Sequence, residues 1–198
     1  MENMRILIAC EFSGTVRDAF IKNGHKAVSC DILPTEAAGP HIQDDLLEVL
    51  KYTHNWDLLI AHPPCTYLSN AGARHLYPKG ELNQERLEKG LIAKQFFMTI
   101  YNANISMICI ENPVPSKVYE LPRYNQVIQP YEFGHEFSKK TCLWLKNLPP
   151  LMATMMVQHN ESTKVAGNWF NKGGKDRQKN RAKTFQGIAD AMAQQWGN

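Results

Sequence analysis

Hydrophobic residues in this chain gather in short unbroken runs instead of alternating with polar ones. Such runs are typical of strands buried on both faces of a sheet, because neither side of the strand meets water. Four of them occupy residues 5–10, 27–30, 56–60 and 106–110. They are separated by amphipathic segments. This order predicts an α/β fold with a mostly parallel, twisted sheet and helices on both of its faces.

Amphipathic periodicity predicts the helices. The predicted segments are residues 15–23, 46–50, 86–102 and 184–196. The three long ones repeat hydrophobic residues at helical spacing: Val16, Ala19 and Phe20; Leu87, Leu91, Phe96, Phe97 and Ile100; Ile188, Ala189, Met192 and Trp196. We expect these stripes to face the core. Gly24 follows the first helix as its expected C-terminal cap.

Two later segments, 127–131 and 142–145, predict a hairpin that closes the sheet. Pro130 cannot donate a hydrogen bond to a neighbouring strand, which favours the sheet edge for the first of them. The chain contains no internal repeat and no sign of a second domain. We therefore expect a single domain over residues 1–198.

Composition narrows the class of protein. The 198 residues suffice for one domain with a sizeable core, and a net charge of +3 does not by itself indicate a nucleic-acid partner. No apolar run is long enough to cross a membrane, and no signal peptide is expected. The five cysteines form no CxxC pair and the histidines lack paired ligand spacing, which favours reduced thiols, a cytoplasmic location and no metal site.

Chemically distinctive residues follow two of the predicted strands. Two prolines stop one strand and are followed by Cys65, while Glu111 and Asn112 end another. Ligands of α/β proteins bind at the carboxyl ends of strands, so a thiol and an acid at neighbouring ends indicate an active site. The alternative is a buried structural thiol beside a capping or ion-paired acid. That alternative does not account for the two prolines.

The first strand–helix–strand unit has the layout of a nucleoside-cofactor site. A tight turn at residues 11–14 follows the first strand, and Asp31 ends the second, where an acid can bind ribose hydroxyls. A full GxGxxG pattern is absent, and a cofactor-free domain explains the same residues. Asp44 and Asp45 precede the helix at 46–50; one of them should cap it, and capping alone accounts for Asp44.

The segment 151–183 differs from the rest in composition. Its aromatic pair is followed by a cationic run: Trp169, Phe170, Lys172, Lys175, Arg177, Lys179, Arg181 and Lys183. Aromatic and cationic side chains together can stack on bases and meet phosphates. A solvated loop explains the charges equally well. Residues 69–84 form another long polar segment, which we expect to be an irregular loop with a functional or mobile role.

Together these features resemble the DNA cytosine-5 methyltransferase family, in particular its short members in phages and prophages. The Pro-Pro-Cys sequence ending at Cys65, with Ser69 four residues later, is similar to the family's catalytic cysteine segment. The sequence 111–113, Glu-Asn-Pro, is similar to its Glu-Asn-Val. Methyltransferases of amino groups carry an aromatic residue at the position of Cys65. The resemblance therefore implies a Rossmann-like class I methyltransferase fold and transfer of the methyl group to a ring carbon, not to an amino nitrogen.

The resemblance also implies the cofactor, the partner and the roles of residues. S-adenosylmethionine would be the cofactor and DNA the substrate, with Cys65 bonding transiently to cytosine C6 and Glu111 supporting the charge at N3. The cofactor-binding residues would be Phe12, Ser13, Gly14, Thr15, Asp31, Ile32, Asp45 and Pro63. The substrate-binding residues would be Pro64, Ser69, Asn112, Lys139, Lys140 and Thr141. The location would be the cytoplasm, that of a bacterial host if the protein is phage-encoded.

The sequence departs from the family pattern at several positions, and these departures leave other functions possible. Gly14 is followed by Thr15 where the family has a second glycine, and Thr141 stands where an arginine meets the cytosine carbonyl. Residues 151–183 take the place of a full target-recognition domain. Two alternatives therefore stand beside DNA cytosine methylation. One is C5 modification of a free or modified pyrimidine nucleotide, and the other is a degenerate protein that binds cofactor or DNA without catalysis.

Overall fold

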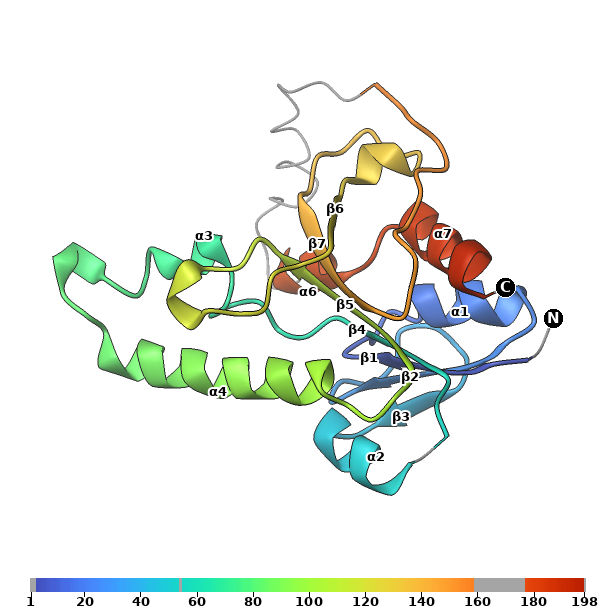
Figure 1. Cartoon of the computed structure of the whole chain (residues 1–198), viewed down its shortest axis with the longest axis horizontal. Helices are drawn as coiled ribbons and strands as arrows, with labels where there is room; N and C mark the ends of the chain where they lie inside the picture. The colour runs from blue at the N-terminus through green and yellow to red at the C-terminus, as the bar shows by residue number, and fades with distance from the viewer. Residues whose placement is uncertain (1–2, 54, 159–176, 198) are drawn as a thin grey trace.

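One mixed sheet forms the centre of the molecule. The computed structural model describes residues 3–53, 55–158 and 177–197 (Figure 1). Within these ranges the sheet has seven strands in the order β3-β2-β1-β4-β5-β7-β6. They are β1 (Arg5–Ala9), β2 (Lys26–Asp31), β3 (His41–Gln43), β4 (Leu58–Ala61), β5 (Met107–Pro113), β6 (Gln126–Ile128) and β7 (Thr141–Lys146). The first five are parallel, and β7 is antiparallel to both β5 and β6.

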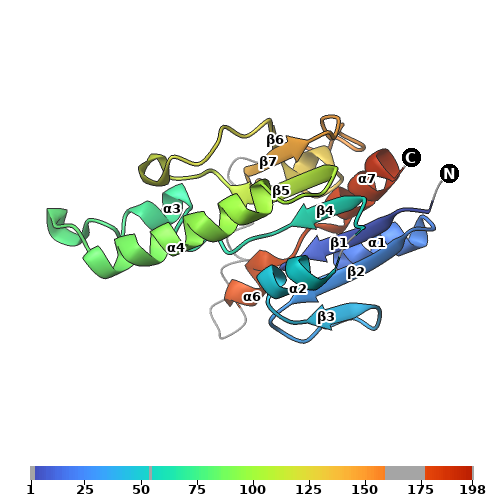
Figure 2. The same ribbon diagram turned by 60° about the horizontal axis from the view of Figure 1, so that its bottom comes forward.

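Helices cover both faces of this sheet. They are α1 (Thr15–Lys22), α2 (Leu46–Tyr52), α3 (Asn70–Ala73), α4 (Gln84–Tyr101), α6 (Arg177–Ala182) and α7 (Gln186–Trp196). Helices α1 and α7 pack side by side on one face, and α2 and α4 lie on the other (Figure 2). The predicted α/β fold with its parallel sheet and closing hairpin is confirmed.

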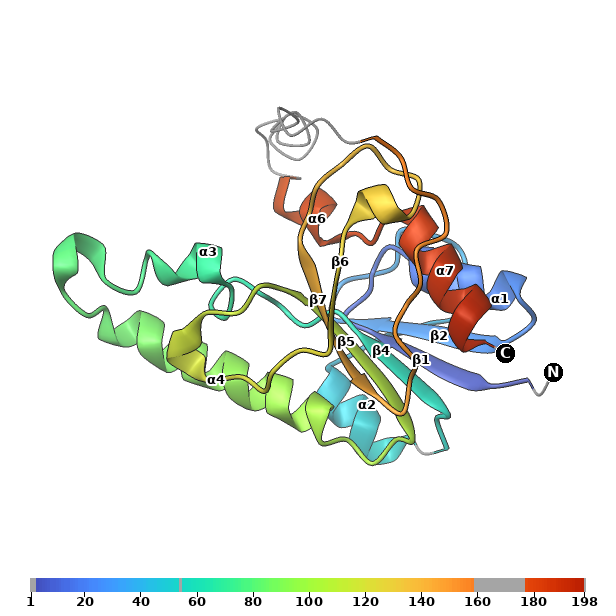
Figure 3. The ribbon, with the colours of Figure 1, turned by 45° about the horizontal axis from the view of Figure 1, so that its top comes forward.

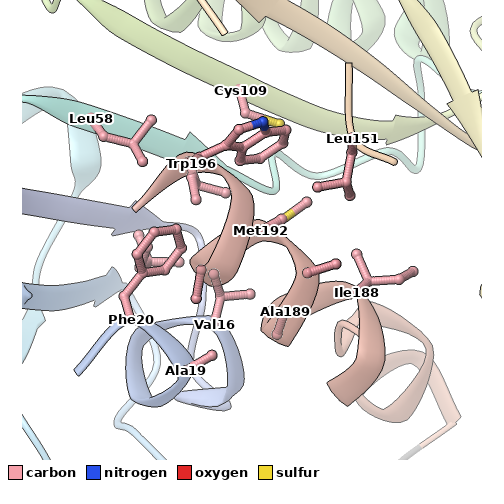
Figure 4. Packing of buried hydrophobic residues seen from close by; sticks show 14 of the residues in the cluster. Val16, Ala19, Phe20, Leu58, Cys109, Leu151, Ile188, Ala189, Met192 and Trp196 are labelled. Carbon is pink, nitrogen blue, oxygen red and sulfur yellow. The ribbon is translucent and has the colours of Figure 1, made fainter. Parts of the chain in front are cut away.

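Alternate strand residues supply the two layers of the core. On one face Ile8 and Ile60 meet the stripe of α1 and the C-terminal helix α7, whose Met192 and Trp196 are directed at the sheet (Figure 4). On the other face Leu7 and its neighbours meet α2 and α4. Burying one such side chain contributes about 1.5–3 kcal/mol. The continuous hydrophobic runs of the sequence are thus explained by burial on both sides.

The predicted stripe of α4 is wrong at one position. Phe97 and Ile100 are buried, and Phe97 meets the ring of Trp144 edge-on with 5.1 Å between ring centroids. Leu91, by contrast, is 50% exposed. The buried side of α4 runs through Gly90, Phe97 and Ile100, and Leu87 also packs on the core, so Leu91 lies outside that side. The N-terminal half of α4 runs beyond the sheet and has α3 beside it (Figure 3). Only the C-terminal half of this helix has a sheet to cover.

Three local differences from the sequence-based expectation concern loops. The strand β3 was not predicted, because three half-exposed residues leave no hydrophobic run. Residues 69–84 hold α3 and the short 3-10 turn η1 (Pro78–Gly80), so they are not wholly irregular. Two further 3-10 turns are η2 (Lys117–Tyr119) and η3 (Pro130–Glu132). Most of the basic segment, residues 159–176, lies outside the described residues.

Candidate active site

The order of the strands places the candidate residues in two neighbouring groups. Strand β1 lies between β2 and β4; the chain leaves β1 through α1 toward β2 and β3 on one side, and returns from β3 through α2 to β4 on the other. Such a switch point is where open α/β sheets bind ligands, outside the carboxyl ends of the strands. The turn at 11–14 and Asp31 follow β1 and β2, while Cys65 and Glu111 belong to β4 and β5. After the roles that the resemblance implies, we call these the cofactor side and the substrate side.

Cys65 lies just past β4, partly exposed, after the buried Pro63 and the exposed Pro64. Its backbone carbonyl accepts a hydrogen bond from Ser69 N at 2.9 Å, which folds the chain back toward α3. Burial and then the charge of Glu111 raise the pKa of the Cys65 thiol, and the charge of Lys139 opposes them. This coupling indicates that Cys65, Glu111 and Lys139 are close enough to influence one another.

Glu111 is tied to a histidine that the sequence-based reasoning missed. His62 Nδ1 lies 3.1 Å from Glu111 Oε2, and the two side chains are only 6% and 14% exposed. Burial by itself would raise the pKa of Glu111, but the hydrogen bond from His62 and the charges of Lys139 and His62 lower it overall. A single histidine has no spacing pattern, so only its position before the two prolines of a strand end could have suggested it.

Asn112 braces the cysteine loop from β5. It is buried, and its Nδ2 donates to the carbonyl of Pro63 at 3.2 Å. The strands β4 and β5 are adjacent and parallel, so this bond joins the two strand ends directly. Asn112 Oδ1 is buried and has no hydrogen-bond partner among the described residues. A ligand with a donor group could complete it.

The substrate-binding residues predicted on β7 and before it divide into two kinds. Lys139 is half-buried, and its Nζ donates to the carbonyl of Arg181 at 3.3 Å, whereas Lys140 is exposed. Thr141 is buried and lies opposite Pro113 of β5, and its hydroxyl donates to the carbonyl of Lys139 at 3.0 Å. Lys139 thus supplies the positive charge near Cys65 and Glu111, together with Arg181, which also lowers the pKa of Cys65.

Ser69 has a structural role in the folded chain. Its side chain is buried and accepts a hydrogen bond from Gly72 N at 3.2 Å, which caps α3. Arg86 of α4 fastens the same segment by donating to the carbonyls of Thr66 and Gly72 at 3.0 and 3.2 Å. Its guanidinium also stacks over the ring of Tyr67. The chain after Cys65 is therefore held against α4 in this structure.

On the cofactor side, a carboxylate that was not predicted, that of Glu11, accepts hydrogen bonds from backbone amides at the start of α1. Glu11 is buried, and its carboxylate accepts hydrogen bonds from Val16 N at 2.7 Å and Arg17 N at 3.3 Å. The N-terminus of a helix attracts anions, and in dinucleotide sites it binds phosphate. Here Glu11 already occupies it. An acid just before a helix start is the signal that could have identified this contact.

The four predicted residues of this turn surround Glu11. Phe12 is buried, and its carbonyl accepts a hydrogen bond from Glu36 N at 2.8 Å. Ser13 Oγ donates to Glu11 at 3.3 Å and accepts from Thr15 N at 3.3 Å. Gly14 has φ = 76°, a conformation that favours glycine, and precedes Thr15, the first residue of α1.

Of the four remaining cofactor candidates, Pro63 follows β4 and the other three lie at the ends of β2 and β3. Asp31 Oδ1 accepts from Leu33 N at 2.9 Å, and Ile32 is 72% exposed. Asp45 caps α2 by accepting from Leu47 N at 2.8 Å, so the cap is Asp45 and not Asp44. Burial and the charges of Asp31, Cys30 and Asp45 raise the pKa of Cys10 strongly, which indicates that both acids border the end of β1.

Arg17 ties the loop after β2 to α1. It is fully buried and its guanidinium donates to many partners: Asp18, Ser29, Thr35, and the carbonyls of Ala37, Ala38 and Pro40. A Cβ atom at Gly14 or Gly39 would lie within 2.9 Å of this guanidinium. The loop that borders Asp31 is therefore fixed from inside the molecule.

These residues fit S-adenosylmethionine better than a phosphate-bearing cofactor. A dinucleotide would need the amides at the start of α1, and those amides already serve Glu11. A cationic sulfonium with a ribose and an adenine would instead meet the acids Asp31 and Asp45 near the end of β1, with the exposed Ile32 available for an apolar contact. Phe12 to Thr15 would then face the cofactor with backbone groups.

The described residues contain no group of three or more His, Cys, Asp or Glu side chains placed to hold a metal ion. All five cysteines are free thiols. No helix in the described ranges is both long and apolar enough to span a membrane. The predicted aromatic pair Trp169 and Phe170 and the cations Lys172 and Lys175 lie outside the described residues.

Solved structures resemble this chain in fold, but no relative was found by sequence. No protein-family model and no curated protein matches the chain. A methyltransferase of Entamoeba histolytica, EhMeth, superposes with a TM-score of 0.47 at 12% identity, covering 81% of this chain and 58% of its own. WbdD gives 0.43 at 10%, covering 81% and 39%. A DNMT2 mutant of Spodoptera frugiperda gives 0.40 at 14%, covering 80% and 56%. The chain thus spans about half the length of these structures.

Proposed function

We propose that this protein transfers a methyl group from S-adenosylmethionine to C5 of cytosine in DNA through a covalent bond between Cys65 and C6. The observation that carries the proposal is the arrangement at the ends of β4 and β5. There a partly exposed thiol, an acid and a bracing amide come from two adjacent parallel strands. A structural thiol would need none of these neighbours.

The chemistry requires this set of groups. Cytosine C5 is a weak nucleophile, and addition of the Cys65 thiolate to C6 turns the ring into an enamine that can attack carbon. Glu111 would donate a proton to N3 as charge moves there, and Asn112 would hold the loop that carries Cys65. When bound, S-adenosylmethionine supplies the electrophilic methyl group. Lys139 would favour both the thiolate and the approach of a phosphate.

The proposal is tested by methyl transfer. Protein is incubated with S-adenosylmethionine labelled in the methyl group and with single-stranded or duplex DNA, because a base inside a duplex must first be flipped out. Labelled 5-methylcytosine in digested DNA, formed by the native protein and not by Cys65→Ser, is the expected result. Absence of label with every DNA, under conditions where the cofactor binds, would contradict the proposal.

A smaller substrate is favoured by one observation. Thr141 takes the place of the family's arginine, is buried, and donates its hydroxyl to the protein's own backbone. The cytosine carbonyl would then lack the charged partner that holds it. The same chemistry on a free or modified pyrimidine nucleotide is therefore the second candidate. It is selected if nucleotides take up label and DNA does not.

A further inference from the structure

His62 and Glu111 form a hydrogen-bonded pair at the substrate side. The imidazole Nδ1 is 3.1 Å from Glu111 Oε2. An ionised carboxylate only accepts hydrogen bonds, so Nδ1 is the donor. The other ring nitrogen, Nε2, is buried and has no partner among the described residues. His62 is the less exposed of the two side chains.

Several titratable groups face this pair, and only one kind titrates near neutral pH. Lys139 acts on Glu111 from the β7 side. The thiols of Cys65, Cys109 and Cys142 have their pKa raised, by burial first and then by the charge of Glu111. Lys140 and Arg181 act on these thiols from further out. Histidine, alone among these types, readily gains and loses a proton near pH 7.

We propose that His62 is the positioning residue of Glu111, holding its carboxylate through Nδ1 and supplying the proton that Glu111 passes to the pyrimidine ring. This inference rests on the function proposed above. Because its pKa is lowered overall, Glu111 is ionised at neutral pH and cannot serve as an acid without a neighbouring proton. His62 Nδ1, 3.1 Å from the carboxylate, is the neighbouring donor in place.

Adduct formation needs a thiolate at Cys65 and a proton at N3. The Cys65 thiol first gives its proton to solvent water. As the thiolate Sγ bonds to C6, the π electrons of the C5=C6 bond form a C4=C5 bond, and the π electrons of the C4=N3 bond move onto N3. N3 takes a proton from Glu111, and Glu111 takes the Nδ1 proton of protonated His62, which becomes a neutral imidazole. If Sγ leaves before methyl transfer, the N3 proton returns along the same path; after methyl transfer, a base must first take the C5 proton.

The test compares two substitutions at His62 by the rate of adduct formation with 5-fluorocytosine DNA. His62→Asn keeps a donor near the position of Nδ1 but cannot store a proton, and His62→Phe keeps the ring volume without a donor. We expect the ratio of the His62→Asn rate to the wild-type rate to fall by roughly tenfold or more between about pH 6 and about pH 9. His62→Phe, which lacks both the donor and the proton, should be the slower of the two variants, by roughly 100-fold or more against the wild type, and its ratio to the wild type should change with pH in the same direction. A His62→Asn ratio that does not change with pH would overturn the proposal, because a merely structural donor gives that result.

A second measurement does not depend on activity. Carbon-13 NMR of labelled glutamate follows the Glu111 carboxyl, whose signal is identified by Glu111→Gln. In His62→Phe the pKa of Glu111 should rise, because burial remains while the hydrogen bond and charge of His62 are gone. An unchanged Glu111 titration would overturn the proposal. Absence of a wild-type adduct together with a raised Glu111 pKa would instead overturn the proposed function and uphold the coupling. In each variant, an unchanged thermal shift with S-adenosylhomocysteine establishes that the fold is intact.

Discussion

The polar groups of the cofactor side and of the substrate side differ in whether their hydrogen bonds are satisfied within the protein. At the ends of β1 and β2 the carboxylates of Glu11 and Asp31 accept hydrogen bonds from backbone amides. At the ends of β4 and β5, by contrast, two buried polar atoms, His62 Nε2 and Asn112 Oδ1, have no partner within the described ranges. Buried polar groups are rarely left unpaired in folded proteins, and exceptions tend to mark function.

The two sides also differ in charge. Acids border the cofactor side, and Lys139 and Arg181 act on the thiol of the substrate side. A cationic cofactor and an anionic substrate would each meet the complementary sign. The difference suggests that the cofactor side is preorganised by its own hydrogen bonds, while the substrate side keeps bonding capacity for the chemistry.

The largest expected effect is a loss of methyl transfer on the substrate side that leaves ligand binding on the cofactor side unchanged. Cys65→Ser should lower methyl transfer by on the order of 10⁴-fold or more, because a hydroxyl at this position is hardly ionised. Binding of S-adenosylhomocysteine, measured by thermal shift, should stay as in the native protein. Activity within tenfold of the native level would show that Cys65 is not the nucleophile.

The second prediction concerns the buried Arg17, which ties the loop after β2 to α1 on the cofactor side. Arg17→Leu should lower the free energy of unfolding by about 3 kcal/mol, because the carbonyls and hydroxyls around the buried guanidinium lose their donor. Urea unfolding measures this change. Lys22→Leu, an exposed change on the same helix, is the matched control and should stay within about 0.5 kcal/mol. Equal stability of the two variants would mean that Arg17 does not hold the loop.

A third prediction separates the two roles of Asp45. Asp45→Ala should cost about 1 kcal/mol of stability, because α2 loses its N-terminal cap. Asp45→Asn should retain the cap and change stability by only a few tenths of a kcal/mol. If Asp45 also meets the cofactor, Asp45→Asn should still weaken S-adenosylhomocysteine binding, as measured by calorimetry. Unchanged affinity would restrict this residue to capping.

The smallest expected effect is a pH shift on the substrate side. The pKa of Cys65 is raised by burial and by Glu111 and lowered by Lys139, and only the thiolate reacts with iodoacetamide. Alkylation of Cys65 should therefore rise with pH toward its pKa. At pH near 7, Glu111→Gln should speed the reaction and Lys139→Met should slow it, each by about threefold. Shifts of the same sign in both variants would contradict the charge arrangement.

The sequence predicted the fold well because its strongest signals come from burial. Four continuous hydrophobic runs correspond to β1, β2, β4 and β5, and the stripe of α7 faces the core as expected. The misses occur where burial is incomplete. Strand β3 is too short and exposed to leave a pattern, and Leu91 repeats at helical spacing but lies outside the side of α4 that Gly90, Phe97 and Ile100 bury.

The site was predictable in its positions but less so in its partnerships. Cys65 and Glu111 could be placed side by side because parallel strands end at one edge. Glu11 and His62 could not, since their contacts join residues by three-dimensional position and leave no spacing in the chain. Ser69 turned out to cap α3, a role that a resemblance to a family does not reveal, whereas the cap of α2 was expected from the sequence at Asp44 or Asp45 and lies at Asp45.

The central claim, that Cys65 bonds to a cytosine ring, is tested most directly by trapping that bond. The native protein and Cys65→Ser are incubated with S-adenosylmethionine and DNA containing 5-fluorocytosine, whose C5 fluorine cannot leave as a proton does. The account predicts a denaturation-resistant protein–DNA adduct whose mass maps to the peptide of Cys65, and none with Cys65→Ser. Absence of the adduct, while S-adenosylhomocysteine raises the melting temperature of the same preparation, would contradict it.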